Sequence, residues 1–177
     1  MLQECSASRV VFIGFLAAFC LSLAACGFHL RGSGPAIAQD LYLEGLPPHD
    51  PFVGTFGNTM SLAGGKLVSS ANQAGGVIRI YSARHFRRYL ALSRAGRSVE
   101  YDLSYRVVYD VRTPKGEVLL PRQEIETKRD YFNDQTLPLG QAEEEGLIRQ
   151  ELEKEAAHAL LRRAVFALTR VSEKKKT

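Results

Sequence analysis

Hydrophobic and polar residues alternate along one central segment of the chain. From Val99 to Val111 every second residue is valine, tyrosine or leucine, and most residues between them are charged or polar. Successive side chains of a strand point to opposite faces of a sheet. This period of two therefore predicts a β-strand with one buried, tyrosine-rich face.

Two further extended runs flank this strand. Residues 76–92 precede it, and the Ser-Arg-Ala-Gly-Arg sequence at 93–97 supplies a glycine for a hairpin turn. Residues 118–132 follow it after a turn that contains proline and glycine, and Pro121 predicts a bulge within this last run. The three runs predict three adjacent antiparallel strands.

Apolar residues at steps of three and four predict two helices. The first begins at about Pro51 and ends at the Gly64-Gly65 pair. The second spans about 139–168, with glutamates near its start and arginines near its end, as the helix dipole favours. The apolar stripe of this second helix consists of Ile148, Leu152, Ala156, Leu160, Ala164 and Leu168.

The helices need an apolar surface to cover, and the tyrosine-rich face of the strands provides one. A short run, Leu41-Tyr42-Leu43, predicts one more strand before the first helix. The expected fold is α+β: a single sheet of about four strands, largely antiparallel, with two helices packed on one face.

The N-terminal segment is typical of a lipoprotein signal peptide. The apolar run from Val10 to Leu23 has 14 residues, whereas a membrane-spanning helix needs about 20. It ends in Leu23-Ala24-Ala25-Cys26, a lipobox, in which small residues precede the cleavage site and a cysteine thiol receives the lipid. We therefore expect cleavage after Ala25 and acylation of Cys26, which anchors the chain to a membrane without spanning it.

These features divide the chain into four parts. Residues 1–25 form the signal peptide, 26–39 an acylated tether, 40–170 one domain, and 171–177 a disordered basic tail. Of the three cysteines only Cys26 remains after cleavage, and its acylated sulfur cannot form a disulfide. The domain must therefore be stabilised by its hydrophobic core.

The sequence carries no motif of an enzyme, cofactor site or nucleic-acid module. The closest approach to a metal motif is Glu155-x-x-His158, but a di-iron site needs a second copy and two more carboxylates. The net charge of +4 is far below that of a nucleic-acid binder. We expect a protein that is not an enzyme and holds no metal or cofactor.

Basic residues gather near the predicted hairpin, where Arg94 and Arg97 flank the turn. Guanidinium groups bind phosphate bidentately, so this tip suits an anionic glycolipid head group. The alternative is that these cations only protect sheet edges from aggregation. The other members of the group are Arg84, His85, Arg87, Arg88, Lys128 and Arg129.

The chain resembles the LPS-assembly lipoproteins of the LptE family over about residues 26–168. Its sequence Cys-Gly-Phe-His-Leu-Arg-Gly at 26–32 is similar to the start of the mature family members. The Arg94–Arg97 hairpin, the Glu100-Tyr101 strand opening and Arg129-Asp130-Tyr131-Phe132-Asn133 follow in the family's order, before an acidic-start helix.

This resemblance implies an outer-membrane lipoprotein that faces the periplasm and plugs the LptD β-barrel in a 1:1 complex. Together the two proteins deliver lipopolysaccharide to the outer leaflet, and the resemblance implies a lipopolysaccharide contact at the hairpin, where Arg94 matches. The loop 137–140 has no cation where some members carry one. The alternative function is a periplasm-facing lipoprotein that binds a small ligand or scaffolds another envelope complex.

Overall fold

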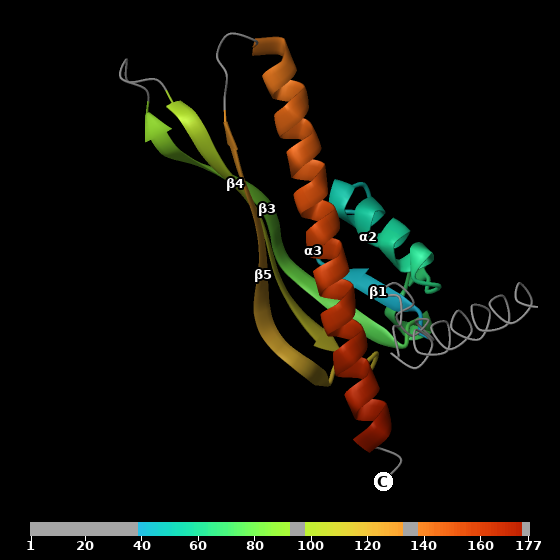
Figure 1. Cartoon of the computed structure of the whole chain (residues 1–177). Coiled ribbons are helices and arrows are strands. Elements are labelled where there is room, and N and C mark those ends of the chain that lie inside the picture. Colours follow the sequence, from blue (N-terminus) through green and yellow to red (C-terminus); the bar gives the residue numbers. More distant parts are fainter. Residues whose placement is uncertain (1–38, 93–97, 133–137, 175–177) are drawn as a thin grey trace, which may run out of the picture. The chain divides into compact units, whose positions relative to one another are not determined.

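The computed structural model describes residues 39–92, 98–132 and 138–174 (Figure 1). These residues belong to one compact unit, which comprises residues 36–177. In chain order the elements are β1 (Leu41–Glu44), α2 (Pro51–Leu62), β2 (Leu67–Val68), the 3₁₀ turn η1 (Ala71–Gln73), β3 (Gly76–Leu92), β4 (Ser98–Arg112), β5 (Val118–Phe132) and α3 (Pro138–Lys174).

One mixed sheet contains all the strands, in the order β2-β1-β3-β4-β5. The pairs β3–β4 and β4–β5 are antiparallel, whereas β1 runs parallel to both β2 and β3. The α+β class and the antiparallel hairpins are confirmed. The fifth strand, β2, has two residues, which is too short for an alternating pattern to appear in the sequence.

Both helices lie on the same side of the sheet (Figure 1). The buried strand face is the tyrosine-rich one, and Tyr101, Tyr105 and Tyr109 are at most 5% exposed. Helix α2 contributes Phe52 and Phe56 to this core. The α3 residues that pack against it include Leu152, Ala156, Leu160, Ala164 and Leu168, all of them in the predicted stripe.

Local sequence explains where α2 begins and ends. The Asp50 carboxylate accepts a hydrogen bond from the Phe52 backbone N–H at 2.9 Å, and Pro51 takes the first helical position. After the helix, Gly64 adopts a φ of +83°, which L-residues with a side chain rarely adopt. The predicted boundaries of this helix are therefore confirmed.

Helix α3 continues to Lys174, beyond the boundary at residue 170 that separated the domain from the expected tail. Residues 171–174 contain neither glycine nor proline, and lysines are favourable near a helix C-terminus because of the helix dipole. The helix therefore ends four residues beyond the expected boundary, and the tail that was expected at 171–177 stays a prediction.

Strand β5 contains an irregularity at the predicted place. Its pairing with β4 passes from Tyr109–Gln123 to Val111–Leu120, so β5 has one residue more than β4 around Pro121. An extra residue of this kind is a β-bulge, and it accommodates a proline that lacks the N–H needed for regular pairing.

Several predicted features lie outside the described residues: the signal peptide, the acylated Cys26, most of the tether, and both Arg94 and Arg97. These assignments remain predictions. Within the described part of the chain, no helix is long and apolar enough to cross a membrane.

Candidate functional site

The face of the sheet that points away from α2 and α3 is the candidate site, and we call it the uncovered face. It lies opposite the helices in Figure 1 and is bordered by β5 on one side. The residues that β4 contributes to it alternate with the buried tyrosines and are Asp102, Ser104, Arg106, Val108, Asp110 and Arg112.

Strand pairing divides the predicted basic group between the two faces. His85 lies opposite the buried Tyr105 and, like Arg87, faces the helices. Arg84 and Arg88 lie on the uncovered face, because neighbouring strand residues alternate. The group is therefore not one binding site.

On the helix-covered side, Glu145 of α3 is surrounded by donors. The Tyr131 hydroxyl donates to it at 2.6 Å, Arg149 donates at 2.6 Å, and the Arg87 guanidinium lies 3.4 Å away. Burial raises the pKa of the Glu145 carboxyl, but the hydrogen bonds from Tyr131 and Arg149 outweigh burial and bring it below its usual value. Burial and the bond to Glu145 raise the pKa of Tyr131 to about 12.

A second contact of this kind joins β3 to α3. His85 Nε2 lies 2.7 Å from a carboxylate oxygen of Glu153, and the imidazole packs on the Tyr105 ring at 4.4 Å between centroids. On β5, Arg129 donates to Glu155 at 2.8 Å. These contacts of His85 and Arg129 hold α3 on the sheet, and Glu155, which began the possible metal motif, is one of the partners.

The uncovered face contains a buried carboxylate. Asp110 is only 3% exposed, and it accepts hydrogen bonds from Arg112 at 2.6 Å and from the Tyr81 hydroxyl at 2.7 Å. Because Arg112 donates two such bonds, the pKa of Asp110 lies below its usual value. The Arg122 guanidinium of β5 stacks over the Tyr81 ring at 3.6 Å, so this cluster extends across three strands.

Other charges on this face are also paired across strands. Arg88 contacts Asp102 at 3.0 Å, and Arg106 donates to Glu126 at 2.8 Å. Lys128 lies 3.2 Å from the same Glu126 carboxylate. The uncovered face is thus a polar surface of mixed and internally balanced charge, rather than a patch of one sign.

Large apolar side chains are exposed near the end of the sheet where β3 leads into β4, which we call the hairpin end. Phe86 is 45% exposed, Tyr89 64%, Leu90 43% and Phe132 of β5 73%. Phe86 lies opposite Ser104 on the uncovered face, whereas Tyr89 lies opposite the buried Tyr101 on the helix side, so both faces of this end expose apolar groups of the kind that mark interaction sites. The predicted site near the turn consisted of cations, so it did not include these apolar residues at exposed strand positions.

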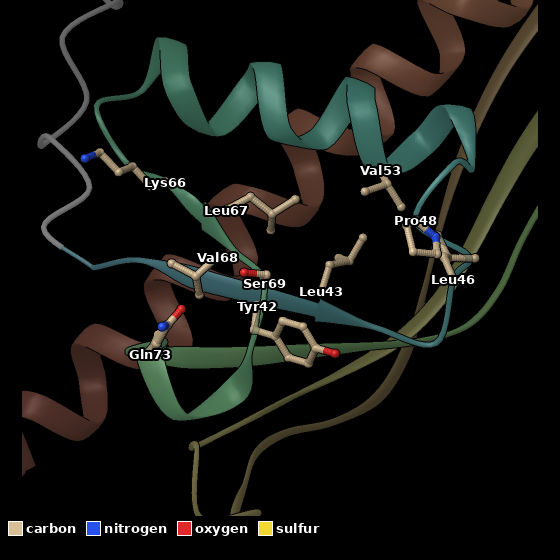
Figure 2. A pocket seen from close by; sticks show the side chains of 10 residues that line it. All are labelled: Tyr42, Leu43, Leu46, Pro48, Val53, Lys66, Leu67, Val68, Ser69 and Gln73. Carbon is tan, nitrogen blue, oxygen red and sulfur yellow. The ribbon is translucent and has the colours of Figure 1, made fainter.

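A pocket of about 570 Å³ lies elsewhere, at the β1–β2 side of the sheet. Figure 2 shows Leu43, Leu67 and Val53 between β1, β2 and α2, whereas Tyr42 points away from α2. Among the described residues that line the pocket, Lys66 is the only charged one, so they offer an apolar wall and one cation but no pair of groups for acid–base chemistry. The remaining lining residues are Leu46, Pro48, Val68, Ser69 and Gln73.

Relatives of this chain are lipopolysaccharide-assembly lipoproteins. The LptE protein of Pectobacterium atrosepticum is 28% identical over 151 residues, which cover 81% of this chain and 78% of that protein. The LptE protein of Yersinia pestis is 28% identical over 145 residues, covering 80% and 69% of the two chains.

Solved structures of lipoproteins share the fold. Lipoprotein B of Nitrosomonas europaea, an NMR structure, has a TM-score of 0.65 at 28% identity and covers 79% of this chain and 92% of its own. The crystal structure of rare lipoprotein B of Shewanella oneidensis gives 0.63 at 27%, covering 76% and 98%. The LptE family profile, described as lipopolysaccharide-assembly, matches residues 49–164. With this match over most of the domain, the chain belongs to the LptE family of lipopolysaccharide-assembly lipoproteins.

Proposed function

We propose that this lipoprotein is the plug and assembly partner of an LptD-type outer-membrane β-barrel, in a 1:1 complex that delivers lipopolysaccharide to the outer leaflet. The observation that carries the proposal is the uncovered face, which is extended, polar and balanced in charge. The family membership supports the same process. The proposed role is transport and assembly and requires no catalytic step.

The chemistry of a barrel lumen explains why such a face is suitable. A barrel wide enough to pass a glycolipid leaks unless its interior is filled, and the interiors of these barrels are polar. On the uncovered face, ion pairs such as Arg88–Asp102 and Arg106–Glu126 satisfy most charges within the domain. A surface of this type contributes complementarity over a wide area, while a few residues dominate the binding energy.

The hairpin end is the part of the domain that we assign to lipopolysaccharide. A glycolipid has anionic phosphates and apolar acyl chains, so its site should combine cations with apolar side chains. Arg94 and Arg97 provide the cations in the sequence, and the described residues near the turn include the exposed Tyr89 and Leu90.

Anchoring in the outer membrane is assigned to the acylated Cys26. Replacing Cys26 by serine removes the thiol that receives the lipid, so the variant should no longer be found as a mature protein in the membrane fraction. Fractionation of envelopes measures this directly. A Cys26→Ser variant that stays in the outer-membrane fraction without the barrel would contradict the assignment.

Affinity purification of the lipidated protein from detergent-solubilised envelopes tests the plug role. We expect one large outer-membrane β-barrel in equal amount, identified by mass spectrometry. Recovery of the lipoprotein alone, or with soluble periplasmic proteins, would reject the plug and favour a scaffold in another envelope complex.

A paired charge reversal tests the lipopolysaccharide contact. Arg94→Glu combined with Arg97→Glu should weaken lipopolysaccharide binding and leave the melting temperature unchanged. Lys115→Glu is the matched control, because Lys115 is an exposed cation in the other long hairpin turn. Equal binding by the reversed and parental proteins would show that the two arginines only protect the edge of the sheet.

The pocket beside α2 supports the second candidate, a lipoprotein that binds a small ligand. Its volume of about 570 Å³ falls within the usual range for small-molecule sites. The apolar lining with Lys66 suits an apolar ligand that carries one anionic group. Thermal-shift screening of the protein with fatty acids tests this function, and stabilisation that is lost in Lys66→Met would support it.

A further inference from the structure

Strand β5 forms one border of the sheet along its whole length. It contains 15 residues and pairs with β4 only, whereas the opposite border is the two-residue strand β2. Among the described residues, the outer edge of β5 has no strand partner. A long edge of this kind exposes backbone N–H and C=O groups that can pair with another chain.

One contact shows which residues of β5 direct these groups outwards. The Arg163 guanidinium of α3 donates to the backbone carbonyl of Glu124 at 3.2 Å. A side chain can reach this carbonyl only if it points away from β4. Because backbone groups alternate along a strand, Glu126 and Lys128 also direct theirs to the outer edge.

Apart from the central Glu126, the charges along this edge form the same pattern when they are taken in reverse order with opposite sign. On the uncovered face β5 carries Arg122, Glu124, Glu126, Lys128 and Asp130, and all five are exposed. We propose that β5 pairs antiparallel with β5 of a second copy of this chain, with the two-fold axis at Glu126. This state goes beyond the proposed function and does not depend on it.

In this register the charged residues complement one another across the axis. Glu124 of each copy faces Lys128 of the other, and Arg122, in the bulge beside Pro121, lies at the same end of the pairing as Asp130 of the other copy. Glu126 faces itself, but within each copy Arg106 lies 2.8 Å and Lys128 3.2 Å from its carboxylate, which offsets the like charge. Cross-strand pairs of opposite charge stabilise antiparallel strands.

The helix side fits the same register. There the half-buried Thr127 of one copy lies opposite the buried Ile125 of the other. Arg163 lies beside Glu124, and Glu155 contacts Arg129, so the axis brings Arg163 of one copy towards Glu155 of the other. On pairing, Arg163 releases the Glu124 carbonyl to the new strand and gains a carboxylate partner.

Charges and prolines on an edge usually oppose such pairing. In β5, however, Pro121 lies within the bulge, outside the segment 123–129 that is centred on the axis. The charges oppose parallel or shifted pairing, in which like charges meet, but they favour this single antiparallel register. The edge therefore accepts a second copy in one arrangement and resists uncontrolled growth.

Disulfide trapping tests the register with the lipidated, full protein in detergent. Directly opposed antiparallel residues have Cα atoms about 5.5 Å apart, within disulfide range. We expect Glu126→Cys to form a covalent dimer under mild oxidation, because position 126 lies on the axis. Glu124→Cys is the matched control and should stay monomeric, whereas Glu124→Cys with Lys128→Cys should cross-link. Equal trapping of the two single variants would overturn the register.

A charge swap tests the energetics by sedimentation equilibrium. Glu124→Lys and Lys128→Glu each create like-charge pairs and should raise the dimer dissociation constant about tenfold. The double variant Glu124→Lys/Lys128→Glu restores opposite charges and should return the constant to near the parental value. A parental protein that stays monomeric at high concentration, or a double variant as weak as the singles, would overturn the proposal.

Discussion

The two halves of α3 contact the sheet by different chemistry. The C-terminal half buries Leu160, Ala164 and Leu168 in the apolar core. The N-terminal half lies over the more polar part of the same sheet face and contacts it through Glu145 and Glu153. One continuous helix therefore contacts the sheet through apolar side chains in one half and through charged side chains in the other.

The two kinds of contact have different roles: apolar burial stabilises the fold, whereas the carboxylate contacts fix the position of the helix on the sheet. Burial of apolar side chains is non-directional and contributes most of the free energy of folding. The carboxylate contacts depend on distance and angle and contribute less once the cost of desolvation is counted. The N-terminal half of α3, which lies towards the hairpin end where we propose lipopolysaccharide binding, is thus attached to the sheet by weaker and more specific contacts.

The largest expected effect comes from the apolar half. Leu160→Ala removes a fully buried side chain and should lower the free energy of unfolding by about 3 kcal/mol. Urea denaturation measures the change. Leu147→Ala is the control in the other half, since Leu147 is 62% exposed, and should change stability by less than about 0.5 kcal/mol. Equal losses would show that the two halves do not differ.

A smaller effect is expected from the charged half. Glu145→Gln leaves Arg87 and Arg149 without their carboxylate and should cost about 1 kcal/mol, because both arginines are partly exposed. Amide hydrogen exchange should accelerate around residues 142–153 and stay slow at 156–168. Glu144→Gln is the control, because the neighbouring Glu144 is exposed. Faster exchange along the whole helix would show that the two halves of α3 do not open independently.

Acid should loosen the same half selectively. The pKa of Glu145 is lower in the folded protein than its ordinary value of 4.5, so its contribution is present above pH 4.5 and is lost as the pH falls below it. Tyr131 has a raised pKa of about 12, so its bond to Glu145 persists below pH 10 and is lost as the pH rises through 12. Protection from hydrogen exchange, expressed relative to the intrinsic exchange rate at each pH, should be lower at pH 3.5 than at pH 7 in residues 142–153, and Glu145→Gln should reduce that difference.

The smallest effect should come from the outer ion pair of this half. Arg129 and Glu155 are each about half exposed, so Arg129→Ala should lower the free energy of unfolding by about 0.5 kcal/mol or less. Adding 0.5 M salt should reduce the difference between this variant and the parental protein further, because salt screens exposed charges. A loss above 1 kcal/mol would place Arg129 among the residues that stabilise the domain.

Sequence patterns predicted the long elements well because their faces differ in polarity. The strands at 76–92 and 118–132, the bulge at Pro121 and the stripe of α3 all follow from alternation or helical spacing. Strand β2 was missed because two residues cannot show a period. Its pairing with β1 depends on tertiary contacts that no local pattern records.

The candidate site was predicted less well, for a different physical reason. Arg84 and His85 are neighbours in sequence, but successive strand residues point to opposite faces, so one lies on the uncovered face and the other under α3. Which charge belongs to which face follows from the alternation itself. The alternation does not identify the partner of each charge, because partners such as His85 and Glu153 are 68 positions apart in the sequence.

Because its strands are long, the sheet is longer than the number of residues in the domain suggests. At about 3.3 Å per residue, the 15 residues of β4 extend to at most about 50 Å. The apolar band of an outer-membrane barrel is about 25 Å tall. If the sheet lies lengthwise in the barrel of the proposed complex, it is long enough to extend past the apolar band. One end of the sheet would then lie deep in the lumen, and the other end would lie in the aqueous periplasm.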